Sequence, residues 1–184
     1  MEKEIIINLN GKKITAPTKP SESTAVFKVK NGRTLIINGD GVVDGGSGSF
    51  DNNAISIEGG HVIINGGMFK VGRDIKGLAN TCIYIRKPGG ILEINGGDFL
   101  CCKSSVKKNE HDWYPIINVT NSLRQSKFSI KITGGTFYGY DPKEGDDSRK
   151  KSFLADGYDS VIDGEYMDNE GNTMPIYKII KKQN

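Results

Sequence analysis

The side chains best suited to chemistry lie in two segments of the chain. The first segment holds His111, Asp112, Trp113 and Tyr114. A tryptophan beside acidic side chains is suited to stacking on a sugar ring, because its wide apolar face covers the ring while neighbouring polar groups bond the hydroxyls. This segment is therefore a candidate contact for a glycan or for a protein partner.

The second segment is rich in carboxylates. The acidic side chains of this segment and of the stretch after it are Asp141, Glu144, Asp146, Asp147, Asp156, Asp159 and Asp163. Clustered carboxylates can bind a hard cation such as calcium, or serve as the acid and base of glycoside hydrolysis. Asp146 and Asp147 are the candidate contact residues here.

Both segments also have a simpler, structural interpretation. Trp113 and Tyr114 can fold back over the strands beneath them, and Lys143 and Arg149 offset the charge of the acidic loop. The chain has two histidines and no HExxH motif, and it lacks a Cys–His nucleophile pattern. We therefore expect no catalytic residues, no enzymatic activity and no cofactor, with calcium as the alternative ligand.

A repeated phrase sets the positions of the strands that carry these segments. The phrase occurs as Ile37-Asn38-Gly39-Asp40, Ile64-Asn65-Gly66-Gly67, Ile94-Asn95-Gly96-Gly97 and Ile132-Thr133-Gly134-Gly135. Its spacings are 27, 30 and 38 residues. A unit that recurs with such a period indicates a stacked solenoid rather than a single globular core.

Apolar side chains recur at fixed positions around the phrase. They lie one and three residues before its Asn or Thr and four residues after it, the last set being Val42, Phe69, Phe99 and Phe137. A further apolar strand precedes each phrase, at residues 25–29, 54–58, 82–86 and 116–120. Period-two spacing is typical of half-buried strands, and the glycine steps end them. The sequence predicts an all-β fold: a short right-handed parallel β-helix of about four to five three-strand coils, with an irregular C-terminal cap.

Stacking these coils predicts two columns of side chains. Asn38, Asn65 and Asn95 would stack at the turn that follows the middle strand, where Asn bonds along the stack and to the turn backbone. Phe69, Phe99 and Phe137 would form an aromatic column in the interior. We interpret both columns as structural ladders and not as ligand sites.

Residues 1–184 are expected to form one domain. Residues 5–24 would form an N-terminal partial coil, residues 25–140 the repeat coils, and residues 141–184 the C-terminal loop and cap. Neither end shows an amphipathic helix that would cover the stack, so we expect open strand edges that pair with another chain. This favours self-association, with a homotrimer as the expected form.

Charge and cysteine content narrow the choice of partners. The net charge is +3, and the basic spots lack interleaved aromatic side chains, so we expect no nucleic-acid partner. No apolar run is long enough for a membrane span or for a signal peptide, so we expect no membrane association. The three cysteines fit free thiols formed in a reducing cytoplasm.

The three-strand coil with its asparagine column resembles the pectate-lyase-like superfamily of right-handed β-helices. That superfamily includes polysaccharide lyases, glycosidases and phage tailspikes. The resemblance covers the scaffold at residues 25–140. The chain contains neither the Asn-Thr-Asp, Asp-Asp and His-Gly set of polygalacturonases nor the Arg-x-Lys arrangement of pectate lyases. The resemblance therefore implies the fold and gives the enzyme interpretation little support.

A narrower resemblance lies near the C-terminal end. Residues 134–142, a charged loop and residues 153–158 are similar to a recurring segment of small virion proteins of tailed phages, especially phages of Bacteroides-type hosts. The resemblance implies a head fibre, a decoration protein or a tail protein. The middle loop departs from the family pattern, because it is rich in Lys and Asp here and in Asn and Ser in the family.

Three hypotheses follow for the function. The first is a non-enzymatic structural component of a tailed-phage virion, made in the host cytoplasm, that trimerises and docks on other virion proteins. The second is a carbohydrate-binding adhesin module that contacts a host-surface glycan through Trp113. The third is a polysaccharide lyase or hydrolase of the β-helix type.

Overall fold

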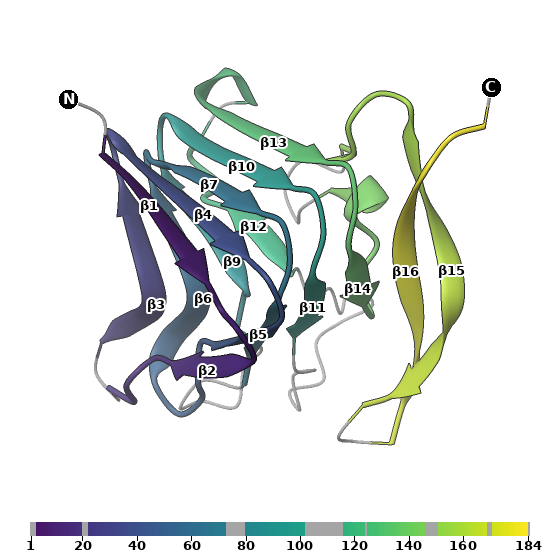
Figure 1. The fold of residues 1–184 in the computed structure, drawn as a ribbon, viewed down its shortest axis with the longest axis horizontal. Coiled ribbons are helices and arrows are strands. Elements are labelled where there is room, and N and C mark those ends of the chain that lie inside the picture. Colours follow the sequence, from purple (N-terminus) through teal and green to yellow (C-terminus); the bar gives the residue numbers. More distant parts are fainter. Residues whose placement is uncertain are drawn as a thin grey trace.

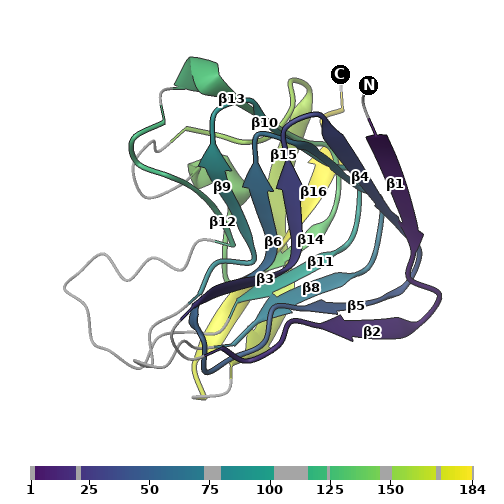
Figure 2. The ribbon, with the colours of Figure 1, turned by 90° about the vertical axis from the view of Figure 1, so that its left-hand side faces the viewer.

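The computed structural model describes residues 3–19, 22–72, 80–101, 116–123, 125–145, 151–168 and 171–183. Its strands form three sheets, here called A, B and C, which wrap around a single interior (Figures 1 and 2). Successive coils take one strand from each sheet: β1-β2-β3, β4-β5-β6, β7-β8-β9 and β10-β11-β12, after which β13 and β14 continue sheets A and B. The all-β, parallel solenoid predicted from the repeat is therefore confirmed.

Sheet A has five parallel strands. They are β1 (Lys3–Asn8), β4 (Arg33–Asn38), β7 (His61–Ile64), β10 (Gly90–Ile94) and β13 (Phe128–Ile132). The isoleucines of the repeated phrase lie at or next to the ends of these strands and are aligned with one another. Ile37 pairs with Ile64, and Ile64 pairs with Ile94. All three are fully buried, so the phrase marks the inward side of sheet A.

Sheet B begins with five parallel strands and ends with an antiparallel hairpin. The parallel strands are β2 (Lys12–Thr15), β5 (Gly41–Asp44), β8 (Met68–Val71), β11 (Asp98–Cys101) and β14 (Thr136–Tyr138). The hairpin consists of β15 (Tyr158–Met167) and β16 (Thr173–Lys181), with β16 paired to β14.

Sheet C has four parallel strands. They are β3 (Ser23–Lys30), β6 (Phe50–Glu58), β9 (Ile83–Lys87) and β12 (Ile117–Val119). Its inward side chains, such as Ile55, Ile57 and Ile83, are fully buried. Helical structure in the described residues is limited to two single 3₁₀ turns, η1 (Gln125–Lys127) and η2 (Pro142–Glu144).

The glycines of the phrase reflect how closely successive coils approach. A Cβ added at Gly96 would lie 2.8 Å from the carbonyl oxygen of Asn65, and one at Gly97 would lie 2.8 Å from that of Gly67. Gly97 also has a φ of +100°, which side-chain-bearing residues rarely adopt. At these two positions the turn from sheet A to sheet B is therefore too tight for a side chain.

The predicted register is wrong by one residue in the second coil. The spacing predicts Val42 as the counterpart of Phe69, but Val43 is its partner and is fully buried, whereas Val42 is partly exposed. The turn that follows Asn38 holds one residue more than the turn after Asn65. This extra residue exchanges the inward and outward positions of β5.

The last coil of the stack is covered by an irregular C-terminal cap, as the sequence predicts. Leu154 forms a parallel bridge with Ile132, and thereby extends sheet A beyond β13. Phe153, Tyr140 and Ile179 are buried over the last coil. A β-hairpin and a loop thus cap this end in place of a helix.

At the N-terminal end of the stack, no described strand pairs with the outer edges of the three sheets. β1, β2 and β3 are the edge strands of sheets A, B and C there (Figure 1). Ile5 aligns with the buried Leu35, yet 57% of its surface is exposed, and Ile6 is 55% exposed. Within the described residues, β1, β2 and β3 therefore form unpaired outer edges at this end.

Candidate functional site

The predicted contact residues lie outside the residues that the structure describes. They are His111, Asp112, Trp113, Tyr114, Asp146 and Asp147. The glycan contact and the calcium site that depend on them remain predictions.

Two described carboxylates of the acidic segment, Asp141 and Asp159, hold the C-terminal cap. Asp141 caps η2, because its Oδ1 accepts hydrogen bonds from the Lys143 backbone N–H at 2.9 Å and from Ser160 Oγ at 2.7 Å. The Lys143 ammonium donates to Asp159 Oδ1 at 2.6 Å. This hydrogen bond lowers the pKa of Asp159 and raises the pKa of Lys143. The charges therefore join the loop to β15.

Other reactive side chains have partners as well. His61 is the first residue of β7, and its Nε2 lies 2.8 Å from Glu93 Oε1. Cys82 is buried, and its Sγ donates to the Leu100 carbonyl at 3.0 Å. Within the described ranges, no three or more His, Cys, Asp or Glu side chains are grouped so as to hold a metal ion.

The asparagines of the repeated phrase form a directional chain of hydrogen bonds. The Nδ2 of Asn65 donates to Asn38 Oδ1 at 2.8 Å, and the Nδ2 of Asn95 donates to Asn65 Oδ1 at 2.9 Å. The chain extends further than the expected three residues, because Asn38 donates to Asn8 at 3.1 Å and Thr133 Oγ1 donates to Asn95 at 2.8 Å. Asn8 follows Ile7 as Asn38 follows Ile37, which is the sequence signal for this first member.

The phenylalanines stack inside the solenoid. The ring centroids of Phe69 and Phe99 are 5.2 Å apart, and those of Phe99 and Phe137 are 4.7 Å apart, with 12° between the planes in both pairs. All three rings are fully buried. No ligand can reach these faces, so the column serves packing.

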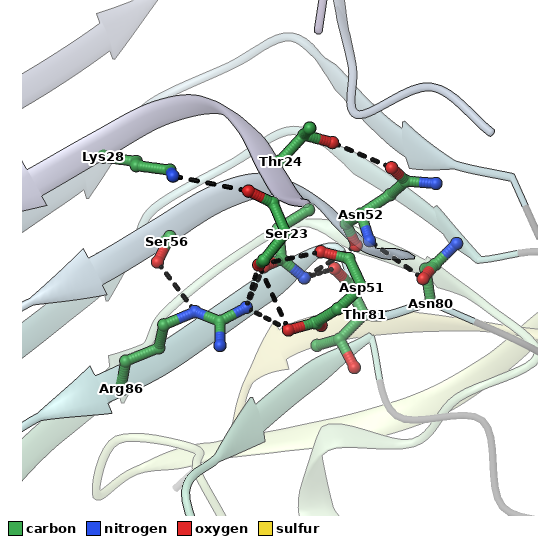
Figure 3. A network of polar contacts seen from close by, with 10 residues as sticks. Ser23, Thr24, Lys28, Asp51, Asn52, Ser56, Asn80, Thr81 and Arg86 are labelled. Carbon is green, nitrogen blue, oxygen red and sulfur yellow. Dashed lines mark hydrogen bonds and ion pairs between the residues drawn. The ribbon is translucent and has the colours of Figure 1, made fainter. Parts of the chain in front are cut away.

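A polar cluster on the outer face of sheet C was not predicted from the sequence (Figure 3). Arg86 is its centre: Nη2 donates to Asp51 Oδ2 at 2.6 Å and to Ser23 Oγ at 3.0 Å, and Nε donates to Ser56 Oγ at 3.1 Å. The guanidinium also lies 4.3 Å from the centre of the Tyr84 ring. These contacts tie one cation to three successive strands of sheet C, β3, β6 and β9.

The backbone of β6 is adapted to this cluster. Asp51 is a bulge residue with a φ of +53°, inserted where Thr24 pairs with Asn52. The bulge places the carboxylate against Arg86, which compensates for a conformation that Asp adopts only occasionally. Asp51 and Arg86 keep 33% and 25% of their side-chain surface exposed.

A second ladder of polar side chains lies at the corner between sheets B and C. Thr24 Oγ1 donates to Asn52 Oδ1 at 2.8 Å, and the Asn52 backbone N–H donates to Asn80 Oδ1 at 2.9 Å (Figure 3). All three residues are at least nine-tenths buried. Among the described residues, Asn52 Nδ2 is left without a partner. The corner is thus a structural joint between coils.

Comparison with protein-family models, curated proteins and solved structures gives no match for this chain. The fold and the geometry of its surfaces are therefore the basis for assigning a function. In the described part of the chain, no helix has the length and apolar character needed to cross a membrane.

In the described part of the chain, large apolar side chains are most exposed at the two ends of the solenoid. Ile5 and Ile6 are exposed at the N-terminal end, and Ile162 and Met167 of β15 are 65% and 72% exposed at the other. Among the described strands, each end also presents a strand with one unpaired backbone edge, β2 at one end and β15 at the other. Free edges with apolar side chains are suited to pairing with another β-structure.

Proposed function

We propose that this chain is a non-enzymatic structural component that works by assembly, as a virion protein of a tailed phage does. The observation that carries the proposal is the pair of exposed strand edges at opposite ends of the solenoid, each bearing large apolar side chains. Such edges are unfavourable in an isolated protein and favourable where another strand covers them.

The contacts between successive coils support the same proposal. The phenylalanine column, the asparagine ladder and the Arg86 cluster commit their side chains to joining one coil to the next. A rod built in this way is a stiff spacer, which suits a head fibre, a decoration protein or a tail part. The virion location rests on the resemblance of residues 134–158 to small virion proteins.

The test is a search for the chain in purified particles. Phage particles from cells that carry the gene would be banded by density and analysed by quantitative mass spectrometry. We expect the chain in the particle band, in a fixed ratio to the major capsid protein. A chain that stays in the soluble lysate while particles form normally would overturn the virion assignment.

A further inference from the structure

The edge strand of the C-terminal hairpin, β15, runs in the same direction as the parallel strands of sheet B. β16 runs antiparallel to β14 and also antiparallel to β15. β15 is therefore parallel to β14 and to every strand of sheet B down to β2. β15 and β2 are the two edges of that sheet, and they lie toward opposite ends of the long axis of the molecule (Figure 1).

The interior column of sheet B also ends in exposed apolar side chains. Beyond the stacked rings, Phe137 aligns with Tyr177, and Tyr177 aligns with Ile162, which is 65% exposed. At the other end, Val43 aligns with Ile14, which is partly exposed on the edge strand β2. The column thus runs from Ile14 to Ile162, and its two terminal members lack a neighbour on one side.

The two edge strands of sheet B carry opposite charge, with Lys178 and Lys181 on the strand beside the acidic edge. Residues 1–30 contain six Lys and three Glu, whereas residues 31–184 contain 19 basic and 19 acidic side chains, so the first coil accounts for the net charge of +3. β15 contains Asp159, Asp163 and Glu165 and neither Lys nor Arg. A basic edge and an acidic edge that run in the same direction are complementary.

We propose that copies of this chain stack head to tail, with β15 of one copy adding as a parallel strand to β2 of the next copy. Ile162 would lie against Ile14 of the next copy and continue the interior column. The interface is heterologous, because it joins two different surfaces of the chain. Copies can therefore be added one after another along the solenoid axis, and no twofold axis limits the assembly to a dimer. The proposal rests on the structural, assembling function proposed above.

Charge selects this arrangement over the other ways in which two copies can meet. Pairing two N-terminal ends would bring two basic coils together, and pairing two β15 strands would bring two acidic edges together. Like charges placed opposite one another in a sheet destabilise the pair. Only the head-to-tail contact matches both the strand direction and the charge.

The test uses two charge-reversed variants and their mixture. Lys3→Glu/Lys12→Glu reverses exposed side chains of the first coil, and Asp163→Lys/Glu165→Lys reverses exposed side chains of β15. Sedimentation velocity of the wild type over a concentration series at low salt should show masses that are multiples of 20.1 kDa and that rise with concentration. Each variant alone should need at least tenfold more protein to associate, and added salt should weaken wild-type association.

Mixing the two variants should restore association, because the acidic N-terminal end of one meets the basic β15 of the other. Recovery in the mixture also shows that both variants are folded. The matched control is Lys131→Glu, a charge reversal on the outer face of sheet A, which should associate like the wild type.

Three results would overturn the stacking proposal. They are a monomer at every concentration, variants that associate like the wild type, and a fixed trimer whose mass neither variant changes. The fixed trimer would leave the proposed structural function in place, because that function is tested separately by the presence of the chain in particles.

Discussion

The middle coils and the terminal coils of this solenoid follow one sequence pattern but differ in burial. Ile37, Ile64 and Ile94 are fully buried in the middle, whereas Ile5 is 57% exposed in the first coil although it aligns with the buried Leu35. Ile162, at the far end of the aromatic column, is 65% exposed. The pattern therefore determines which side chains point inward, while burial requires a neighbouring coil on both sides. We therefore expect most of the stability to come from the middle coils, while the association that we propose involves the ends.

The largest expected effect is at the centre of the aromatic column. Phe99→Ala removes a fully buried ring that stacks on two others, and should lower the free energy of unfolding by about 3 to 5 kcal/mol. Ile5→Ala, an inward position of the open coil, should lower it by less than about 1 kcal/mol at protein concentrations where the chain is monomeric. Urea denaturation followed by circular dichroism measures both. Equal losses would contradict the contrast between middle and end.

The Arg86 cluster provides a second stabilising joint, this one on the outer face. Arg86→Met should lower the free energy of unfolding by about 2 kcal/mol, because Asp51 loses its charge partner while it remains two-thirds buried in a strained conformation. Asp51→Asn combined with Arg86→Met should cost less than the sum of the two single changes. Additive losses in denaturant titrations would mean that the ion pair is not the source of the effect.

The sequence predicts the parts of the fold that repeat and misses the parts that break the repeat. The Ile-Asn-Gly phrase recurs with its apolar neighbours, so the strands, their parallel stacking and the two columns could be derived from period and spacing alone. The inward position of Val43 could not be derived in this way. The turn after Asn38 is one residue longer than the turn after Asn65, and no local pattern shows which of Val42 and Val43 points inward. The hairpin β15–β16 also escaped prediction, because residues 161–164 imitate the phrase while the chain reverses direction.

The Arg86 cluster shows a different limit of the sequence. Its members come from three coils, and the side chains meet only because a bulge with a φ of +53° at Asp51 redirects one carboxylate. A positive φ at a residue other than glycine has no reliable signal in a single sequence. The polar run Asp51-Asn52-Asn53 at the start of an apolar strand was the available indication.

Asp44 links the open first coil to the middle of the stack and should do so in a pH-dependent way. Its carboxylate lies 2.9 Å from Lys13 Nζ in β2 and 3.7 Å from Lys70 Nζ in β8. Burial acts to raise the pKa of Asp44, but the hydrogen bonds from Lys13 and from the Gly46 N–H outweigh it, and the pKa lies below its ordinary value of 3.8. The pair therefore stabilises the fold above that value, and the contribution is lost as the pH falls through the lowered pKa.

Asp44→Asn should accordingly cost roughly 1 kcal/mol at pH 7 and progressively less below about pH 4. Thermal or urea unfolding of both proteins between pH 7 and pH 2.5 measures the difference. Asp163→Asn is the comparison for an exposed ion pair and should cost less, since Asp163 lies 3.3 Å from Lys178 Nζ and 54% of its side chain is accessible. A cost of Asp44→Asn that stays constant down to pH 2.5 would contradict the assigned ion pair.

The smallest effects are expected in the asparagine ladder, where they compare middle and end within one column. Asn65 donates to Asn38 and accepts from Asn95, whereas Asn8 only accepts from Asn38. Because the ladder is solvent-exposed, water replaces part of each lost bond, and Asn65→Ala should cost about 1 kcal/mol. Asn8→Ala should cost only a few tenths, since it removes one acceptor at a 3.1 Å bond. If Asn8→Ala destabilised the chain as much as Asn65→Ala, the ladder would act as one cooperative unit, and the first coil would be coupled to the middle more tightly than its exposure indicates.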